Sequence, residues 1–195
     1  MTTPVEVLDF WLGEIGPEGW YAGGADLDDE CRARFGDLVE AAAAEGLDHW
    51  VEGPAGALAF LILTDQLPRN IYRASAQAFA TDPAARAAAR RAIDQGWDLE
   101  VPEPERQFFY LPLEHSEDPA DQDLAVSLIA ERLPGMSDSL LHARAHHAII
   151  ARFGRFPFRN AALGRDSSQA EIEFLSQGGY AATLEAMKTQ DGQGG

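Results

Sequence analysis

The chain has 195 residues, of which 46% are hydrophobic and 24% charged, and its formal net charge is −17. These proportions are typical of a folded globular protein and exclude a disordered one, and no apolar run reaches the roughly 18 residues of a membrane span. The negative charge argues against nucleic acid and against an anionic membrane surface as partners, because both are bound through basic faces.

The start of the chain lacks the basic and small-residue signals of a secretory leader, and acidic residues begin at Glu6. A single cysteine, Cys31, cannot form an intrachain disulfide. We therefore expect a protein of the reducing cytoplasm.

Apolar residues at helical spacing, with proline in first turns and glycine after last turns, predict helices along nearly the whole chain. In chain order we expect helices over residues 4–13, 26–46, 54–66, 81–96, 103–111, 118–135, 137–154, 167–179 and 180–188. Pro68 should end or kink the third of these, and Pro112 should break the fifth. No segment shows the period-two alternation of a strand.

The pattern predicts an all-α single domain of about eight or nine helices over residues 1–188, followed by a flexible tail over 189–195. We find no self-similar period along the chain, so periodicity by itself does not indicate a helical repeat.

Acidic and basic residues are segregated in one stretch. Residues 139–165 contain no Asp or Glu, although about four would be expected at the chain's average of 32 in 195 residues. The same stretch holds five arginines and three histidines, interleaved with phenylalanines: Arg144, Arg152, Arg155, Arg159, Arg165, His142, His146, His147, Phe153, Phe156 and Phe158.

Two interpretations of this segregation stay open. The arginines can pair with acidic side chains from elsewhere in the chain and link the helices, because a guanidinium binds a carboxylate through two parallel hydrogen bonds. Alternatively, they can line a site for an external anion, with arginine stems and phenylalanine rings as an apolar collar.

Two further segments are candidates for the same site. Asp65, Gln66, Arg69 and Asn70 surround the break at Pro68, where polar groups either join a buried network or line a cleft. Residues 114–117 follow Pro112, where irregular backbone can bring several polar side chains together.

Chemistry is less clearly indicated. His115 could act as a general acid or base oriented by Glu114 or Glu117, but a histidine beside acids also occurs by chance. His142 and His146 have the spacing of a metal pair without an identifiable third ligand, so we expect no metal and no cofactor. No P-loop, dinucleotide fingerprint or nucleophile elbow occurs, and the acidic surroundings of Cys31 disfavour a reactive thiol.

Six segments together resemble the bacterial family called domain of unknown function 924. They read "LDFWLG", "TDQLPRNIYR", "AFATDP", "FFYLPLEHSED", "HHAIIARFGRFPFRNAALGR" and "FLSQGG", and they extend from about residue 5 to about residue 180. The resemblance implies an all-α fold of antiparallel helical hairpins, similar to tetratricopeptide-repeat proteins, but it brings no known activity.

The polar residues that recur in the family correspond to positions in the segments already identified. They are Asp65, Gln66, Arg69, Asn70, His115, Ser116, Glu117, His146, Arg152, Arg155, Arg159 and Asn160. Relatives usually have histidine where this chain has Phe158, and this departure weakens any mechanism that needs a histidine there.

Three functions follow, in this order. The first is binding of a small anionic molecule or an acidic peptide end, through Arg69, Asn70, His115, Glu117, His146, Arg152, Arg155, Arg159 and Asn160, with Asp65, Gln66 and Ser116 as a supporting network. The second is a protein-interaction module in which the polar cluster is purely structural. The third is a small-molecule enzyme that uses His115, Glu117 and His146 for acid–base chemistry.

Overall fold

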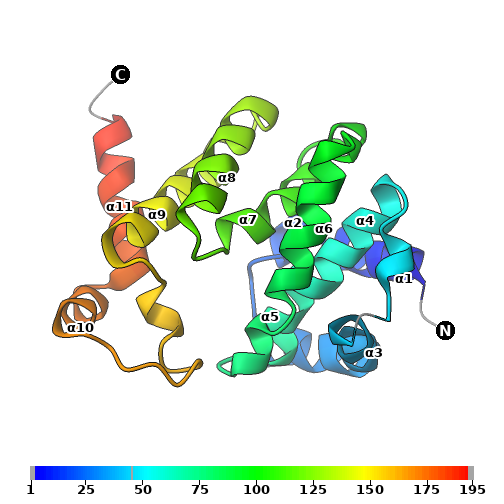
Figure 1. Cartoon of the computed structure of the whole chain (residues 1–195), viewed down its shortest axis with the longest axis horizontal. Helices are drawn as coiled ribbons and strands as arrows, with labels where there is room; N and C mark the ends of the chain where they lie inside the picture. The colour runs from blue at the N-terminus through cyan, green and yellow to red at the C-terminus, as the bar shows by residue number, and fades with distance from the viewer. Residues whose placement is uncertain (1–2, 45, 193–195) are drawn as a thin grey trace. The chain divides into compact units, whose positions relative to one another are not determined.

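The computed structural model of the chain describes residues 3–44 and 46–192, without the side chains of 190–192, and its regular structure is helical throughout (Figure 1). The predicted all-α class is confirmed, and these residues contain no strand. By its internal contacts the chain divides into two compact units, Met1–Pro112 and Leu113–Gly195, which we call the N-terminal and the C-terminal unit. The single domain over 1–188 and the tetratricopeptide-like hairpins stay predictions.

The N-terminal unit is built around a buried helix. α4 packs against α1 and α6, while α3 packs against α5. As its composition predicts, α4 is apolar on nearly all sides, and Ala57 to Leu61 are buried. The α-helices are α1 (Pro4–Leu8), α2 (Gly16–Gly19), α3 (Ala25–Ala43), α4 (Pro54–Leu61), α5 (Leu67–Ile71) and α6 (Asp82–Asp94). π-Helical segments occupy Asp9–Ile15 and Ile62–Gln66, and 3-10 turns occupy Asp48–Trp50, Ala76–Phe79, Trp97–Glu100 and Glu105–Phe109.

The break expected before Pro68 takes the form of a π-helical turn. Proline has no N–H, so the carbonyl of Thr64, four residues earlier, loses its usual helical donor. The backbone widens instead: the N–H of Leu67 donates to the carbonyl of Ile62, five residues before it. The hydroxyl of Thr81 donates to the Thr64 carbonyl at 2.6 Å. The chain therefore passes the proline with its buried carbonyl satisfied.

The region around Pro112 differs from the prediction. A helix over 103–111 broken by Pro112 is wrong: a 3-10 turn at Glu105–Phe109 is followed by α7 (Leu111–Glu114), which has Pro112 in its first turn. Proline is tolerated there because first-turn N–H groups have no helical acceptor. The irregular segment consequently begins after Glu114.

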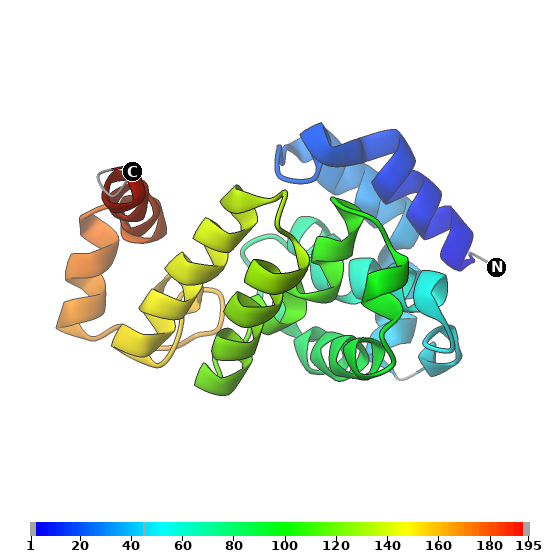
Figure 2. The ribbon, with the colours of Figure 1, turned by 90° about the horizontal axis from the view of Figure 1, so that it is seen from above.

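The C-terminal unit contains α8 (Pro119–Arg132), α9 (Ser137–Phe153), a 3-10 turn at Pro157–Arg159, α10 (Gln169–Ser176) and α11 (Gly179–Gly192). α9 packs against α8 and α11, and α8 and α9 lie side by side in both views (Figures 1 and 2). Gly154, with φ of 68°, ends α9 as predicted. Of the expected tail, 189–192 continue α11, and 193–195 lie outside the described residues.

Candidate functional site

The predicted site residues are divided between the units. The 65–70 segment belongs to the N-terminal unit, and the 114–117 and 152–160 segments belong to the C-terminal unit. Within the C-terminal unit the latter two meet, because Arg159 Nη1 donates to the main-chain oxygen of His115 at 3.0 Å.

Asp65 and Arg69 belong to an internal network of the N-terminal unit. Asp65 is 1% exposed, and its Oδ2 accepts a hydrogen bond from Gln66 Nε2 at 2.6 Å. Arg69 Nη2 lies 3.5 Å from Asp65 Oδ1 and 2.8 Å from Asp82 Oδ1. Its Nη1 donates to the carbonyl of Ala78. Arg69 therefore connects α5 to the beginning of α6.

Asn70 contacts an acidic residue that sequence reasoning did not select. Its Nδ2 donates to Asp28 Oδ1 at 2.9 Å, and Arg73 holds the same carboxylate through Nε at 2.6 Å and Nη2 at 2.7 Å. The Arg73 hydrogen bonds are the main reason that the pKa of Asp28 lies below its ordinary value. Asp28 lies on α3, and nothing local in the sequence indicates a partner so far along the chain.

The segment after α7 is fixed by Gln122 on α8. The amide nitrogen of Gln122 donates to the main-chain oxygens of Glu114 at 2.6 Å and Ser116 at 2.7 Å. The hydroxyl of Ser116 donates to Asp121 Oδ2 at 2.5 Å and accepts the N–H of Asp118 at 3.2 Å. These bonds hold the segment against the first turn of α8.

Glu117 has a different partner from the one expected. Its carboxylate was predicted to orient His115, but both oxygens pair with Arg165, Oε2 at 2.7 Å and Oε1 at 3.0 Å. Oε1 also accepts the N–H of Phe156 at 2.8 Å. Burial raises the pKa of Glu117, but the Arg165 and Phe156 hydrogen bonds lower it more, and the net shift is downward.

Arg165 and Asn160 close the loop after α9. Arg165 Nε donates to Asn160 Oδ1 at 3.0 Å, and Nη2 donates to the Phe156 carbonyl at 3.2 Å. Asn160 is buried, and its Nδ2 donates to Ser167 Oγ at 3.0 Å. These contacts give Asn160 a position inside the loop.

Arg155 is also bound internally. Its Nε and Nη2 grip Glu171 Oε1 and Oε2 at 2.6 and 2.8 Å, and Nη2 also donates to the Asp166 carbonyl at 2.8 Å. The Arg155 pair is the largest cause of the low pKa of Glu171, followed by the hydrogen bond from the N–H of Ser168. Sequence reasoning did not select Glu171; its only local signal is the capping box that it forms with Ser168.

The two other predicted arginines lie against aromatic rings. The guanidinium of Arg159, a buried residue, is 4.5 Å from the centre of the Phe156 ring. Arg152 is exposed, and its guanidinium is 4.6 Å from the Phe153 ring and 5.7 Å from the Phe174 ring. The interleaving of arginine and phenylalanine thus produces cation–π contacts within the C-terminal unit.

His146 is held in one protonation geometry. Its Nδ1 lies 2.8 Å from Glu114 Oε1 and 3.0 Å from the main-chain oxygen of His142. A carbonyl oxygen only accepts, so Nδ1 must carry the hydrogen, and in the neutral ring Nε2 holds the lone pair. Nε2 has no hydrogen-bond partner in the described part of the chain. The sequence suggested Glu114 only as an alternative partner for His115.

Aromatic rings surround this imidazole. The rings of Phe156, Tyr180 and His115 lie 5.3, 4.7 and 6.0 Å from it, centre to centre. His142 stacks on Tyr180 at 5.9 Å, and its Nδ1 contacts the Tyr180 hydroxyl. Burial is the main reason that the pKa of His142 is lowered. We call these residues the His146 cluster: Glu114, His115, His142, His146, Phe156 and Tyr180.

Phe158 lies at the edge of the His146 cluster. Its ring stacks on Phe156 at 5.2 Å, lies 6.2 Å from that of Tyr180, and remains 41% exposed. The position at which the resemblance leads us to expect a histidine is therefore next to the cluster.

Two buried acceptor oxygens near the cluster lack donors. Glu114 is 2% exposed and Gln122 is fully buried, yet Glu114 Oε2 and Gln122 Oε1 have no hydrogen-bond partner among the described residues. Such atoms are costly to leave unpaired. No local sequence pattern indicates them, because they become acceptors without donors only in the folded chain.

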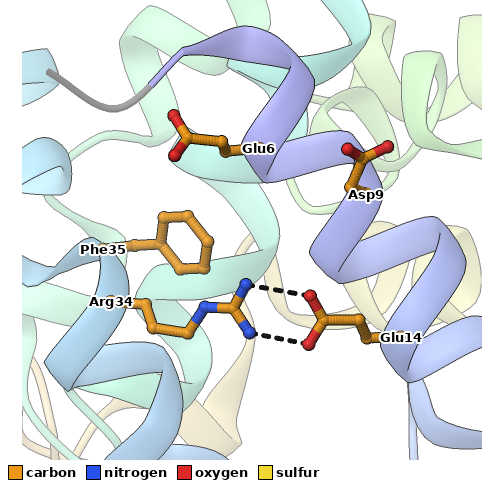
Figure 3. A pocket seen from close by; sticks show the side chains of 5 residues that line it. All are labelled: Glu6, Asp9, Glu14, Arg34 and Phe35. Atoms are coloured by element: carbon orange, nitrogen blue, oxygen red, sulfur yellow. Dashed lines mark hydrogen bonds and ion pairs between the residues drawn. The ribbon is translucent and has the colours of Figure 1, made fainter.

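A separate surface hollow lies in the N-terminal unit (Figure 3). It has a volume of about 330 Å³ and is lined by Glu6, Asp9, Glu14, Arg34 and Phe35. Arg34 and Glu14 point toward each other across it and form two hydrogen bonds of 2.7 and 2.9 Å. The guanidinium is therefore occupied within the hollow.

Other sequence features have clear structural settings. Cys31 is buried, and burial, with Asp28 and Glu30 nearby, raises its pKa to about 11. Residues 3–44 and 46–192 contain no group of three or more His, Cys, Asp or Glu side chains arranged to hold a metal ion. In the same stretches, no helix combines the length and apolarity needed to cross a bilayer.

The fold and the site define an all-α protein with a carboxylate-bound histidine in its C-terminal unit. The sequence profile of a family described as a bacterial protein of unknown function (DUF924) matches residues 7–179, so the chain belongs to this family, as the resemblance implied. A solved structure, that of the protein of unknown function ATU0120 from Agrobacterium tumefaciens, is 42% identical, with a TM-score of 0.83. The match covers 89% of this chain and 97% of that one. No curated protein matches the sequence significantly.

Proposed function

We propose that the C-terminal unit binds a small molecule at the His146 cluster. The observation that carries the proposal is the fixed imidazole of His146, whose Nδ1 is held by Glu114 and the His142 carbonyl while Nε2 is left as an acceptor. An imidazole fixed in this way is ready to receive a hydrogen bond from a ligand without losing further side-chain entropy.

The surroundings of His146 support this function. Small-molecule sites combine apolar and aromatic walls with a few placed polar groups. Phe156 and Tyr180 lie against the imidazole, and Phe158 extends the aromatic surface outward. His146 itself keeps 13% of its side chain exposed.

The arginines support a different role from the anion grip that the sequence suggested. Arg69 and Arg155 are bound to carboxylates of their own unit, as is Arg165. These contacts favour the structural-network hypothesis for the three guanidiniums. An anionic ligand or an acidic peptide end stays a prediction that would depend on Arg152 and Arg159.

A second candidate function is proton transfer by His146. A carboxylate bound to Nδ1–H of an imidazole fixes its orientation and stabilises the imidazolium that forms when Nε2 accepts a proton. Glu114 has this relation to His146, which makes it the orienting carboxylate in place of Glu117. A proton-transfer enzyme and a binding protein would share the same site.

The protein's surroundings follow from weaker signals. A lone buried cysteine supports the predicted reducing, cytoplasmic environment. A protein partner, bound at a surface outside the His146 cluster, stays an alternative.

The test compares two neighbouring histidines. A fragment library is screened by thermal shift against the wild type, His146→Gln and His147→Gln; His147 pairs with Asp123 on the same helix and serves as the control. We expect a set of fragments that raise the melting temperature of the wild type and His147→Gln but not of His146→Gln. Fragments that stabilise all three proteins equally, or no stabilising fragment, would contradict the proposal.

A further inference from the structure

We infer that the ligand of the His146 cluster presents hydrogen-bond donors to the protein, as a primary ammonium group does. The inference rests on the proposed function and specifies the ligand's chemistry. Its evidence is the kind of buried polar atom that the C-terminal unit leaves without a partner, namely acceptors.

The first such atom is Glu114 Oε2. The other oxygen of this carboxylate pairs with His146 Nδ1 at 2.8 Å, so the carboxylate is held with Oε2 turned away from that bond. Glu114 is 2% exposed, and water outside the protein does not reach Oε2. A buried carboxylate oxygen needs a donor, and the strongest is a charged N–H.

The second atom is Gln122 Oε1, and its identity is secure. The amide nitrogen of Gln122 faces the main-chain oxygens of Glu114 and Ser116 at 2.6 and 2.7 Å. Turning the amide over would bring an oxygen against these oxygens, which can only accept. The nitrogen therefore stays where it is, and Oε1 is left without a donor in the part of the chain that the structure describes.

The donors of the unit are in the opposite condition. Arg155 is bound to Glu171 and to the Asp166 carbonyl, and Arg165 is bound to Glu117, Asn160 and the Phe156 carbonyl. An anionic ligand would have to break these bonds to obtain donors. A ligand that brings its own donors finds Glu114 Oε2, Gln122 Oε1 and His146 Nε2 ready to accept them.

The enclosed oxygens also limit the size of the group that reaches them. A water molecule or a single –NH₃⁺ terminus is small enough, whereas a quaternary ammonium is larger and carries no N–H donor. The rings of Phe156 and Tyr180 near His146 suit a cation as well, because an aromatic face attracts positive charge.

Methylammonium chloride is the probe, and tetramethylammonium chloride at the same ionic strength is its control. The melting temperature of the full chain is measured against each salt for the wild type, Glu114→Gln and Glu173→Gln; Glu173 is an exposed residue of α10. We expect methylammonium to raise the wild-type melting temperature saturably, by about 3–6 °C at roughly ten times its dissociation constant. Glu173→Gln should respond equally, and Glu114→Gln should lose the rise.

Each outcome has one meaning. Equal responses to the two salts, or a full methylammonium response in Glu114→Gln, overturn the inference. If Glu114→Gln does not fold, the difference between the two salts on the wild type decides alone. Fragments that need His146, without any response to methylammonium, overturn the donor inference and leave the proposed function standing. A crystal soaked in methylammonium that shows only water at both oxygens overturns the donor inference too.

Discussion

At the scale of single residues, the acidic partner decides what each basic side chain can do. Arg155 and Arg165 are each gripped by one carboxylate through two hydrogen bonds, so their donors are directed inward. His146 has the same kind of partner but a second ring nitrogen, and that nitrogen stays available. Positive charge in a sequence therefore indicates anion binding only when internal carboxylates leave it unmatched.

Glu117→Gln should remove the charge that holds Arg165 and destabilise the protein by about 1–3 kcal/mol at pH 7. The pKa of Glu117 is lowered by folding, so its stabilisation is complete above its ordinary value of 4.5 and is lost as pH falls through the lower folded value. Urea denaturation at pH 7 and at about pH 3 measures this. The difference between wild type and variant should be large at pH 7 and small at the acidic pH.

Glu173→Gln is the control for this substitution, because Glu173 is exposed on α10. Its free energy of unfolding should stay within about 0.5 kcal/mol of the wild type. A Glu117→Gln effect of the same size at both pH values would show that lost packing, rather than lost charge, causes the destabilisation.

At the scale of helices, two glycines should respond to the same substitution with opposite sign. A Cβ at Gly56 in α4 would lie 2.1 Å from the carbonyl oxygen of Trp50, whereas a Cβ at Gly36 in α3 would meet only the Arg32 side chain at 3.9 Å. Gly56→Ala should therefore destabilise by about 1–3 kcal/mol, despite the helix preference of alanine. Gly36→Ala should stabilise by about 0.5–1 kcal/mol.

Thermal and urea unfolding of the two variants test this pair of signs. Gly36→Ala is the matched control, since it changes the same atoms in another helix. A stabilising Gly56→Ala would mean that the Trp50 carbonyl does not lie over the first turn of α4.

Helix ends were predictable where a local residue dictates them. Gly154 ends α9 in the left-handed conformation, and Asp118 caps α8 by accepting the N–H of Ala120. The π-helical turn before Pro68 was predictable only as a break, because its form depends on the Thr81 hydroxyl, 17 residues away. Local rules give the place of a break, and tertiary contacts give its geometry.

Thr81→Val should expose the cost of that turn. The variant keeps the shape of the side chain but leaves the Thr64 carbonyl without its 2.6 Å donor, in a buried position. We expect a loss of about 1–3 kcal/mol in the free energy of unfolding. Thr81→Ser retains the hydroxyl and should lose less, and equal losses in the two variants would contradict the role of the hydrogen bond.

At the scale of the whole molecule, negative charge is unevenly distributed. The N-terminal unit has 20 acidic and 8 basic residues, a net charge of −12, and the C-terminal unit has 12 and 7, a net charge of −5. The acid-free stretch at 139–165 predicted that its arginines matter. It could not identify Glu117 and Glu171 as their partners, because neither lies in the stretch and both are brought to it by folding.

The excess charge predicts that salt stabilises the protein. Like charges repel more strongly in the compact native state than in the extended unfolded chain, and salt shortens the range of that repulsion from about 10 Å at 0.1 M to about 3 Å at 1 M. Salt also weakens exposed ion pairs such as Arg32–Asp29, but each of these contributes little. We therefore expect the melting temperature at pH 7 to rise between low salt and about 0.5 M potassium chloride. Sucrose at equal osmolality separates the effect of charge from that of crowding, and a fall in melting temperature with potassium chloride would show that ion pairs outweigh the repulsion of the net charge of −17.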